Sequence, residues 1–396
     1  MERLFEKSYK KLDRTPDRFY RYLLQNIDFS NRMIGIKVAR GAGKTTLLLQ
    51  YAHRELPLDH QVLYTSLDDL WFTENKLVDL ADTFVKQGGR YLLLDEVHRY
   101  PGWSQELKNI YDDQPDLSVI FTGSSIMHLD KARADLSRRA VMYELRGLSF
   151  REYLSLETTV SLEKLDWEIL LNDHVQIARS IIQKVKPLEH FTGYLKHGYY
   201  PYFLENVNVY PQKLEETISL ALSTDLPALH DLTPASIEKI RQLLYIIAES
   251  APFKPNISKL SERTGVSRNT LISFLHHLED LRIINGLYHS AKGIGALQKP
   301  EKIYLHHPNL QYALAYSAME IGAVRESFFI NQASAVKDVT YTSEGDFAVE
   351  GDMFEVGGKD KQQRQLKNFK RSFVVADGIE IGHEHKIPLW MFGLLY

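Results

Sequence analysis

Residues 38–46, VARGAGKTT, have the spacing of a phosphate-binding loop. The general pattern is a glycine, four residues and then Gly-Lys-Ser/Thr; Gly43, Lys44 and Thr45 satisfy it, while Val38 replaces the first glycine. In such a loop the backbone N–H groups surround phosphates, the lysine reaches the β- and γ-phosphates, and the hydroxyl coordinates Mg²⁺. Val38 weakens the pattern without excluding it, because the first glycine mainly serves the turn out of the strand. The predicted nucleotide-binding residues are Arg40, Gly41, Ala42, Gly43, Lys44, Thr45, Thr46 and Asp95.

Two carboxylates follow an apolar segment further along the chain. In residues 91–96, YLLLDE, Asp95 and Glu96 end a segment that we expect to be a buried strand. In this Walker B arrangement the first carboxylate helps to hold Mg²⁺ and the second polarises the attacking water. The alternative, an ordinary strand terminus, is less favoured after a phosphate-binding loop. We therefore predict that Lys44 and Glu96 are catalytic and that Thr45 and Asp95 bind the Mg²⁺ that accompanies ATP.

Hydroxyl and guanidinium groups downstream are further catalytic candidates. The apolar segment 118–125 carries Thr122 and Ser124 at its end, where hydroxyls can sense the γ-phosphate or orient water. Arg138 and Arg139 can stabilise charge on the transferred phosphoryl group, either in cis or from a neighbouring subunit. A solvated basic turn is the alternative for this arginine pair. The predicted catalytic set therefore also includes Ser124, Arg138 and Arg139.

Length and composition limit the class of protein. The 396 residues suggest roughly two to three domains. With 48 Lys and Arg against 51 Asp and Glu, the overall charge favours neither a polycation nor an acidic solvating chain. The absence of cysteine excludes disulfides and thiol-bound zinc, and no apolar run approaches the ~20 residues that span a bilayer. We predict a soluble, cytoplasmic protein that does not contact membranes.

The order of apolar segments predicts the secondary structure. Short apolar runs (MIGIKVA, QVLYTSL, YLLLDEV and LSVIFTGSS) alternate with helical patterns over residues 1–150, which is typical of a parallel α/β sheet. A largely helical stretch follows, and the last hundred or so residues return to a mixed α/β pattern. The predicted domains are 1–150 (ATPase), 151–235 (helical segment), 236–298 (winged helix-turn-helix) and 299–396 (α/β).

Several quoted stretches resemble one known family. GAGKTTLLLQ, LLLDEVHRYPGWSQELKNIYD, FTGSS and LSRRAVMYELRGLSFREYL occur in the order seen in the AAA-type ATP-binding proteins of bacteria and archaea. In those proteins a short ATPase core precedes a helical segment and a winged helix. The resemblance implies an intracellular ATPase with ATP and Mg²⁺ as cofactors. Family members usually keep the glycine that Val38 replaces here.

The middle of the chain has the pattern of a helix-turn-helix. Residues 256–290 contain two helical patterns separated by a Gly-Val-Ser turn, in which Ser267 can cap the second helix. Arg268 and Asn269 then lie at its N-terminal end, where base or phosphate contacts are commonly made. Residues 282–288 suit a wing. DNA is therefore a candidate partner, and the alternative is a module that packs against protein.

Acidic residues near the C-terminal end suggest a second site. Asp346, Glu355 and Lys359 resemble the pattern of the restriction-endonuclease-like fold, in which acids on two strands and a lysine bind a divalent metal and activate water. Glu326 on a preceding helical stretch is a candidate third ligand. The lysine normally lies two residues after the acid, where this chain has Gly357. A degenerate or binding-only domain is the alternative.

Together these patterns predict an α/β P-loop NTPase sheet, a helical and winged-helix middle, and a C-terminal α/β domain of restriction-endonuclease-like fold. The predicted function is Mg²⁺-dependent ATP hydrolysis that couples nucleotide state to a DNA- or protein-contacting winged helix and a nuclease-like domain. One alternative is a nucleotide-gated binding switch with little turnover. Another is a metal-dependent DNA nuclease. Association of the chain with copies of itself is a further expectation, because arginines of this type act in cis or in trans.

Overall fold

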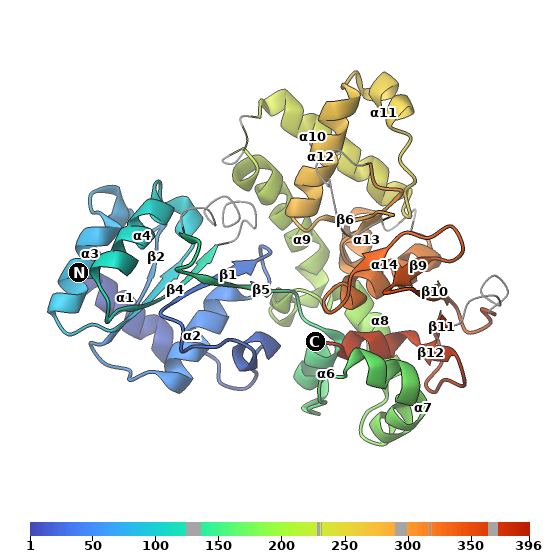
Figure 1. Ribbon diagram of the computed structural model, residues 1–396, viewed down its shortest axis with the longest axis horizontal. Helices are drawn as coiled ribbons and strands as arrows, with labels where there is room; N and C mark the ends of the chain where they lie inside the picture. The colour runs from blue at the N-terminus through green and yellow to red at the C-terminus, as the bar shows by residue number, and fades with distance from the viewer. Residues whose placement is uncertain are drawn as a thin grey trace. The chain divides into compact units, whose positions relative to one another are not determined.

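The computed structural model describes residues 1–123, 136–227, 230, 232–289, 299–315, 317, 319–362 and 371–396. The chain divides into two compact units, Met1–Gly147 and Leu148–Tyr396, which Figure 1 shows as ribbons. The predicted domain boundary at residue 150 stays a prediction, as does the predicted division of the remainder at residues 235 and 298.

The first unit is built on a five-stranded sheet with the order β2-β3-β4-β1-β5, in which all neighbouring strands are parallel. Its strands are β1 (Met33–Val38), β2 (Val62–Ser66), β3 (Tyr91–Asp95), β4 (Ser118–Gly123) and β5 (Val141–Leu145). The predicted α/β fold of a P-loop NTPase is confirmed. Because the strands are parallel, the residues that follow β1, β3 and β4 meet at one edge of the sheet.

Helices cover both faces of this sheet, as Figure 1 shows. They are α1 (Glu2–Asp13), α2 (Lys44–Glu55), α3 (Leu77–Lys86) and α4 (Trp103–Asp113), with the 3₁₀ turns η1 (Tyr22–Gln25), η2 (Leu70–Thr73) and η3 (Val97–Arg99). Successive strand residues point to opposite faces. In β4, Val119 and Phe121 therefore join the apolar cluster with α3 and α4, while Ile120 joins the cluster with α2.

The second unit begins with helices. They are α6 (Phe150–Thr158), α7 (Trp167–Ile182), α8 (Pro187–His197), α9 (Tyr210–Leu220) and α10 (Pro234–Glu249), with the 3₁₀ turns η4 (Pro201–Leu204) and η5 (Val207–Val209) and the π-helical turn η6 (Ala221–Asp225). The start of α6 is fixed by a capping box, because Ser149 and Glu152 bond each other's backbone N–H groups. Asp166 caps α7 in a similar way by accepting from two backbone N–H groups.

A small helical and β-hairpin group follows. It contains α11 (Ile257–Thr264), α12 (Arg268–Asp280), and the antiparallel strands β6 (Ile284–Leu287) and β7 (Lys302–Leu305). Phe253 adds an isolated bridge to Ile303 on the second of these strands. Glu279 fixes the hairpin to the end of α12, since its carboxylate accepts from the Gly286 N–H and the Tyr288 hydroxyl, both at 2.7 Å.

The last part of the chain forms a mixed sheet with the order β12-β11-β10-β9-β8. Its elements are α13 (Pro308–Leu314), α14 (Ile321–Ala333), β8 (Val339–Thr340), β9 (Phe347–Val349), β10 (Asp352–Gly357), β11 (Ser372–Ala376), β12 (Lys386–Pro388) and the 3₁₀ segment η9 (Leu389–Leu394). The three strands β10, β11 and β12 are parallel, and β8 and β9 join them antiparallel. Phe329 of α14 packs against Phe354 of β10 and Phe392 of η9 in the buried interior.

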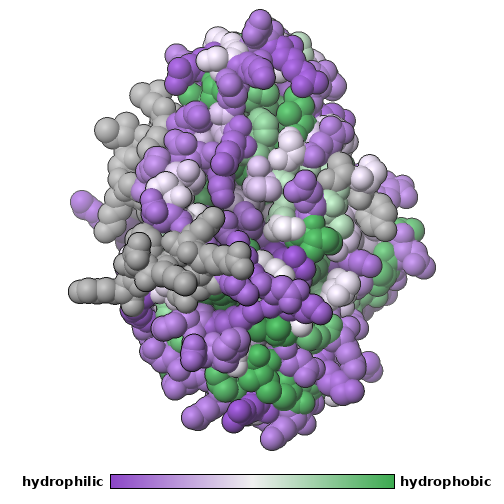
Figure 2. All heavy atoms as spheres, turned by 90° about the vertical axis from the view of Figure 1, so that its right-hand side faces the viewer, coloured by the Kyte–Doolittle hydropathy of each residue, from purple (hydrophilic) through white to green (hydrophobic). Residues whose placement is uncertain are grey.

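Among the residues that the structure describes, no helix is long and apolar enough to cross a membrane. Figure 2 shows a face of the molecule on which hydrophilic side chains predominate, with smaller hydrophobic areas between them. This distribution is usual for protein surfaces, which also expose apolar atoms.

A buried polar side chain, Asn309, ties α13 to two other helices of the second unit. Its amide donates to the carbonyls of Tyr194 and Leu195 at 3.0 and 2.8 Å. Its oxygen accepts from the Tyr199 N–H at 2.9 Å and from the Tyr210 hydroxyl at 2.6 Å. The side chain is fully buried, so water cannot replace these bonds.

Replacing Asn309 with Ala should therefore lower the free energy of unfolding by about 3 kcal/mol or more, because several buried groups lose their partners together. Urea denaturation followed by circular dichroism measures the change. The control is Asn208→Ala, at an exposed position, with an expected change within about 0.5 kcal/mol. Equal stability of the two variants would contradict this account of Asn309.

Candidate nucleotide-binding site

The loop between β1 and α2 has a backbone suited to an anion. Gly41 and Gly43 have φ angles of 86° and 93°, in the left-handed region that side chains disfavour. Gly43 precedes the first turn of α2, and no side chain caps that helix. Its first N–H groups lack intrahelical acceptors, and the helix dipole adds partial positive charge there. The loop therefore fits a phosphate group.

Val38 occupies a position that does not need glycine. It is the last residue of β1, pairs with Leu145 of β5, and is fully buried in the apolar cluster that includes Ala42 and Leu47. Its φ is not positive, in contrast to Gly41 and Gly43. The departure from the glycine pattern is thus accommodated by the strand and filled by a packed side chain.

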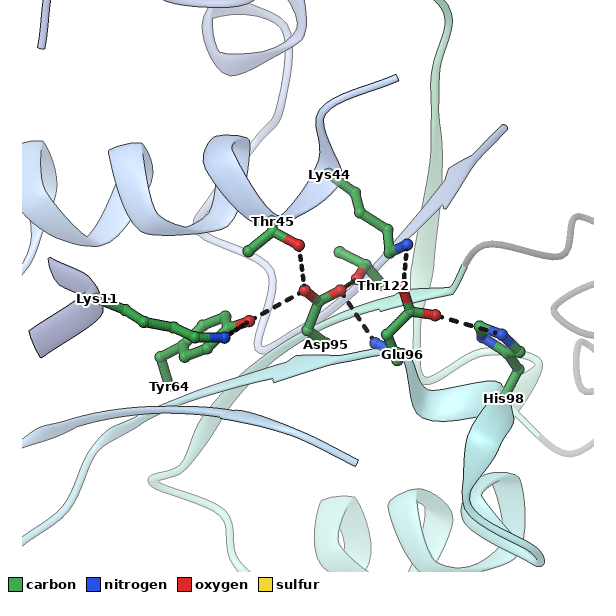
Figure 3. A network of polar contacts seen from close by, with 8 residues as sticks. All are labelled: Lys11, Lys44, Thr45, Tyr64, Asp95, Glu96, His98 and Thr122. Atoms are coloured by element: carbon green, nitrogen blue, oxygen red, sulfur yellow. Dashed lines mark hydrogen bonds and ion pairs between the residues drawn. The ribbon is translucent and has the colours of Figure 1, made fainter. Parts of the chain in front are cut away.

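Asp95 lies at the centre of the polar contacts drawn in Figure 3. Its carboxylate accepts from the hydroxyls of Thr45 and Thr122 at 2.5 Å each, and from the Tyr64 hydroxyl at 3.0 Å. The Glu96 N–H donates to it at 3.0 Å. The side chain is 2% exposed, so these donors replace water around the charge. The ends of β3 and β4, the start of α2 and strand β2 all meet at this carboxylate.

Tyr64 is held as a hydrogen-bond donor at this position. Burial, and then the neighbouring charge of Asp95, raise the pKa of its phenol, which therefore keeps its proton. Lys11 of α1 donates to the same hydroxyl at 3.3 Å. Helix α1 thereby reaches the site through Tyr64, a connection that Figure 3 makes visible.

Glu96 is the second carboxylate, and its backbone is unusual. Its φ of 54° is in the left-handed region, which costs energy for a non-glycine residue and is common at functional sites. The carboxylate forms an ion pair with Lys44 through Oε1, and Oε2 lies 3.3 Å from Nε2 of His98. The lysine of the loop and the carboxylate are therefore partners of each other in this arrangement.

The oxygens of Thr45 and Asp95 are suited to Mg²⁺, which takes hard oxygen ligands and is usually held by one or two carboxylates together with phosphates and water. In the described ranges, no group of three or more His, Asp or Glu side chains is placed to hold a metal ion by itself. The donor set at Asp95 fits a metal that arrives with a nucleotide better than a resident one.

The predicted arginines lie elsewhere in the first unit. Arg138 and Arg139 precede β5, whose first residue, Val141, pairs with Ile34 near the start of β1. They are therefore at the amino edge of the parallel sheet, opposite the loop before α2. Arg139 forms a two-point contact with Asp112 at 2.8 and 2.9 Å, while Arg138 is exposed. Within one copy of this unit they are not brought together with Lys44. Ser124, the other predicted catalytic residue, lies outside the described residues.

Two further residues, Arg21 and His98, lie near the loop and were not among the residues predicted from the sequence. Arg21 is 3% exposed, and its guanidinium donates to the carbonyls of Ala42 at 2.5 Å, Arg146 at 2.6 Å and Gly147 at 2.9 Å. His98 contacts the catalytic candidate Glu96. His98 follows the carboxylates by a few residues and could have been noticed, whereas nothing in the local sequence marks Arg21.

The acidic residues predicted near the C-terminal end lie close to one another. Burial raises the pKa of Glu326, and the charge of Asp346 raises it further; Tyr304 donates to its carboxylate at 2.7 Å. Burial also raises the pKa of Glu355, which is 2% exposed and has one carboxylate oxygen without a hydrogen bond. The lysine beside them is Lys361, whose Nζ lies 3.9 Å from Asp346.

Lys359, the lysine predicted for that site, has a different neighbourhood. Its carbonyl accepts from Lys386, and it lines a surface cleft with His383 and His385. Strand β10 ends at Gly357, and the chain then turns, with the Lys361 N–H donating to the Gly358 carbonyl at 3.0 Å. The side chain of Lys361 lies against Gly357, where a Cβ would be 2.8 Å from it. The turn brings the later lysine to the carboxylates.

In the segment predicted to be a helix-turn-helix, Ser267 accepts from the Thr270 N–H at 3.3 Å and caps α12. Arg268 and Asn269 are exposed in the first turn of that helix. Their placement is compatible with contact to a partner.

Comparison with known proteins supports the assignment of the first unit. Residues 30–154 match a family described as an AAA domain, and residues 188–318 match a domain of unknown function (DUF8612). An uncharacterized protein of Methanocaldococcus jannaschii is 28% identical over 382 residues, covering 88% of this chain and 80% of that protein. The AAA-domain match includes the loop, Asp95 and Glu96. The first unit has the α/β fold of a P-loop NTPase, and most of it is similar to this AAA-domain family.

Solved structures resemble the chain more distantly. The Walker-type ATPase of Pyrococcus abyssi has a TM-score of 0.38 at 14% identity, over 78% of this chain and 95% of that one. The ORC1 protein of Aeropyrum pernix, solved in complex with DNA, has a TM-score of 0.31 at 14% identity, over 80% of this chain and 92% of that one.

Restoring the glycine at position 38 should not improve nucleotide binding, because the backbone there is extended. We expect Val38→Gly to leave ATP affinity within about twofold and to destabilise the fold by about 2–4 kcal/mol through the lost buried side chain. Isothermal titration calorimetry and urea denaturation measure the two effects. Val141→Gly removes the same atoms at a position that is 38% exposed and should cost less. A large gain in affinity for Val38→Gly would contradict this interpretation.

Proposed function

We propose that this protein is a Mg²⁺-dependent ATPase whose site lies between the loop before α2 and the end of β3. The observation that supports this most strongly is the convergence of Thr45 from the loop on Asp95, with Glu96 as the next residue and paired to Lys44. A glycine-rich loop that arose by chance would not be expected to contact two acidic residues at the end of another strand of the sheet.

Each side chain has a defined task in the proposed reaction. The N–H groups at the start of α2 and the ammonium of Lys44 bind the phosphates. Thr45 and Asp95 would hold Mg²⁺, which would supply positive charge to stabilise the phosphates. When a γ-phosphate attracts Lys44, Glu96 loses that partner and its carboxylate can polarise the attacking water. We propose that His98, whose Nε2 lies 3.3 Å from the other oxygen, limits rotation of this carboxylate.

The arginine pair suggests a role for a second copy of the chain. Arg138 and Arg139 lie at the edge of the sheet opposite Lys44, so they cannot serve the site of their own copy in this arrangement. Arg138 is exposed to solvent, so its guanidinium is accessible to a neighbouring copy. We propose that a guanidinium, if one is used in turnover, comes from a neighbouring copy.

The proposed output of the ATPase is a change in how the second unit meets its partner. The exposed Arg268 and Asn269 at the capped start of α12 suit contact with DNA phosphates or bases. A protein partner is the alternative. A fall in affinity with rising salt concentration is expected for DNA, because phosphate contacts release counterions.

The ATPase proposal is tested with Lys44→Ala and Glu96→Gln. We expect Lys44→Ala to lose ATP binding and turnover, since the loop loses its cation. Glu96→Gln should lose at least about 100-fold in turnover while binding ATP at least as tightly as the wild type, because Lys44 no longer has to leave an ion pair. Phosphate release and calorimetric titration of ATP with Mg²⁺ are the measurements.

The exposed Lys86→Ala, which removes a lysine paired only with Asp82 on its own helix, is the matched control and should behave like the wild type. If Glu96→Gln hydrolysed ATP at the rate of the wild type, the role proposed for Glu96 would be wrong. ATP binding without turnover in the wild type would favour a nucleotide-gated switch, in which the ion pair between Lys44 and Glu96 reports occupancy. Equal ATP binding by wild type and Lys44→Ala would refute the site.

A second candidate activity, metal-dependent phosphodiester cleavage, rests on Glu355. This carboxylate is almost completely buried, has one oxygen without a partner, and lies near Asp346 and Lys361. Two carboxylates and a lysine form a minimal set for a metal that shares its ligands with a phosphate. Binding of DNA without cleavage is the alternative for this domain.

Incubation of supercoiled DNA with Mg²⁺ or Mn²⁺ tests the cleavage proposal. Any nicking by the wild type should fall to background in Asp346→Asn and Glu355→Gln, because each removes a charge that would hold the metal. The exposed Glu344→Gln should cut like the wild type. Nicking that persists in both variants would come from another site or from a contaminant and would contradict this proposal. If the wild type does not nick DNA, the cleavage proposal fails and the alternative is a domain that only binds DNA.

A further inference from the structure

Arg21 contacts the phosphate-binding loop at the carbonyl of Ala42. Its Nη1 donates to the Ala42 carbonyl at 2.5 Å, and its Nη2 donates to the carbonyls of Arg146 and Gly147 at 2.6 and 2.9 Å. The guanidinium is buried, so these bonds form in a region of low dielectric constant, where hydrogen bonds from a charged donor are strong.

The contact with Ala42 fixes the direction of a particular N–H group. The peptide bond between Ala42 and Gly43 is planar and trans, so its carbonyl and its N–H point in opposite directions. With the carbonyl held on the Arg21 side, the Gly43 N–H must point away from the guanidinium. The positive charge of Arg21 also polarises the peptide and strengthens this N–H as a donor.

The same guanidinium holds the end of the first unit. Arg146 and Gly147 follow β5, and Gly147 is the last residue before the chain enters the second unit. A planar guanidinium has donors in a fixed fork, so the carbonyl of Ala42 cannot turn without weakening the bonds to residues 146 and 147. The loop and the chain exit are therefore joined by one rigid group.

We propose that Arg21 is a positioning residue that orients the Gly43 N–H toward the nucleotide phosphates and transmits the nucleotide state of the loop to the chain exit at residues 146–147. This inference rests on the proposed ATP binding at Lys44 and Thr45. A purely structural role would predict the same buried bonds with or without nucleotide, and no link between the loop and the exit.

Hydrogen–deuterium exchange of the wild-type full chain, with and without ATP and Mg²⁺, tests the link directly. ATP should slow exchange in peptides that cover residues 39–46 and, to a similar relative extent, in peptides that cover residues 144–148. Protection of the loop alone would overturn the transmission. Absence of ATP binding by the wild type would refute the proposed function itself, and this inference with it.

Arg21→Lys tests the positioning role. Lysine keeps the charge but lacks the fork, so it cannot hold all three carbonyls in the same plane. We expect ATP affinity to fall by roughly tenfold or more, as for the loss of a hydrogen bond from a charged group. Slower exchange on adding ATP should then persist in residues 39–46 and disappear in residues 144–148. Circular dichroism first establishes that the variant is folded at the temperature used.

Arg18→Lys is the matched control, because Arg18 is exposed three residues earlier in the same segment and should give wild-type affinity and exchange. Unchanged ATP affinity and unchanged coupled protection in Arg21→Lys, with a wild type that binds ATP, would overturn the role of Arg21 and leave the ATPase proposal intact. If Arg21→Lys does not fold, the wild-type exchange experiment alone decides.

Discussion

The hydrogen bond from Thr45 to Asp95 joins the two parts of the chain from which the proposed nucleotide site is built. Thr45 belongs to the first turn of α2, and Asp95 ends β3, which is separated from β1 in the sheet by β4. A buried carboxylate must be surrounded by donors, and here Thr122 of β4 and Tyr64 of β2 complete the set. The sheet order is therefore what allows one carboxylate to organise the site.

Parts of this arrangement could be predicted because they depend on neighbours in the sequence. Short apolar runs between helical patterns indicate a parallel sheet, and a loop such as residues 38–46 shows its chemistry within a few residues. The strand order and the contacts of Tyr64 and Arg21 are different. They connect residues 21 to 126 positions apart, and no local pattern encodes such distances.

The positions of charged residues likewise could not be predicted, because they depend on contacts between distant parts of the sequence. The Arg138-Arg139 pair suggested phosphate chemistry, but its place at the start of β5 and the contact of Arg139 with Asp112 depend on tertiary structure. Near the C-terminal end, Lys359 was predicted to lie with Asp346 and Glu355, but the lysine beside Asp346 is Lys361. The turn that follows Gly357 brings Lys361, rather than Lys359, to Asp346. The type of a charged residue near a site can therefore be predicted from the sequence more readily than its exact spacing from the other residues.

The replacement of a glycine by Val38 has a consequence for motion of the loop. In the common pattern a glycine at the strand end can act as a hinge. Here that end is anchored by a branched side chain that is buried in the same apolar cluster as Leu145 and Ala42, so rotation about its backbone is restricted. Any opening that admits or releases a nucleotide must therefore pivot at Gly41 and Gly43, close to the phosphates, rather than swing from the base of the loop.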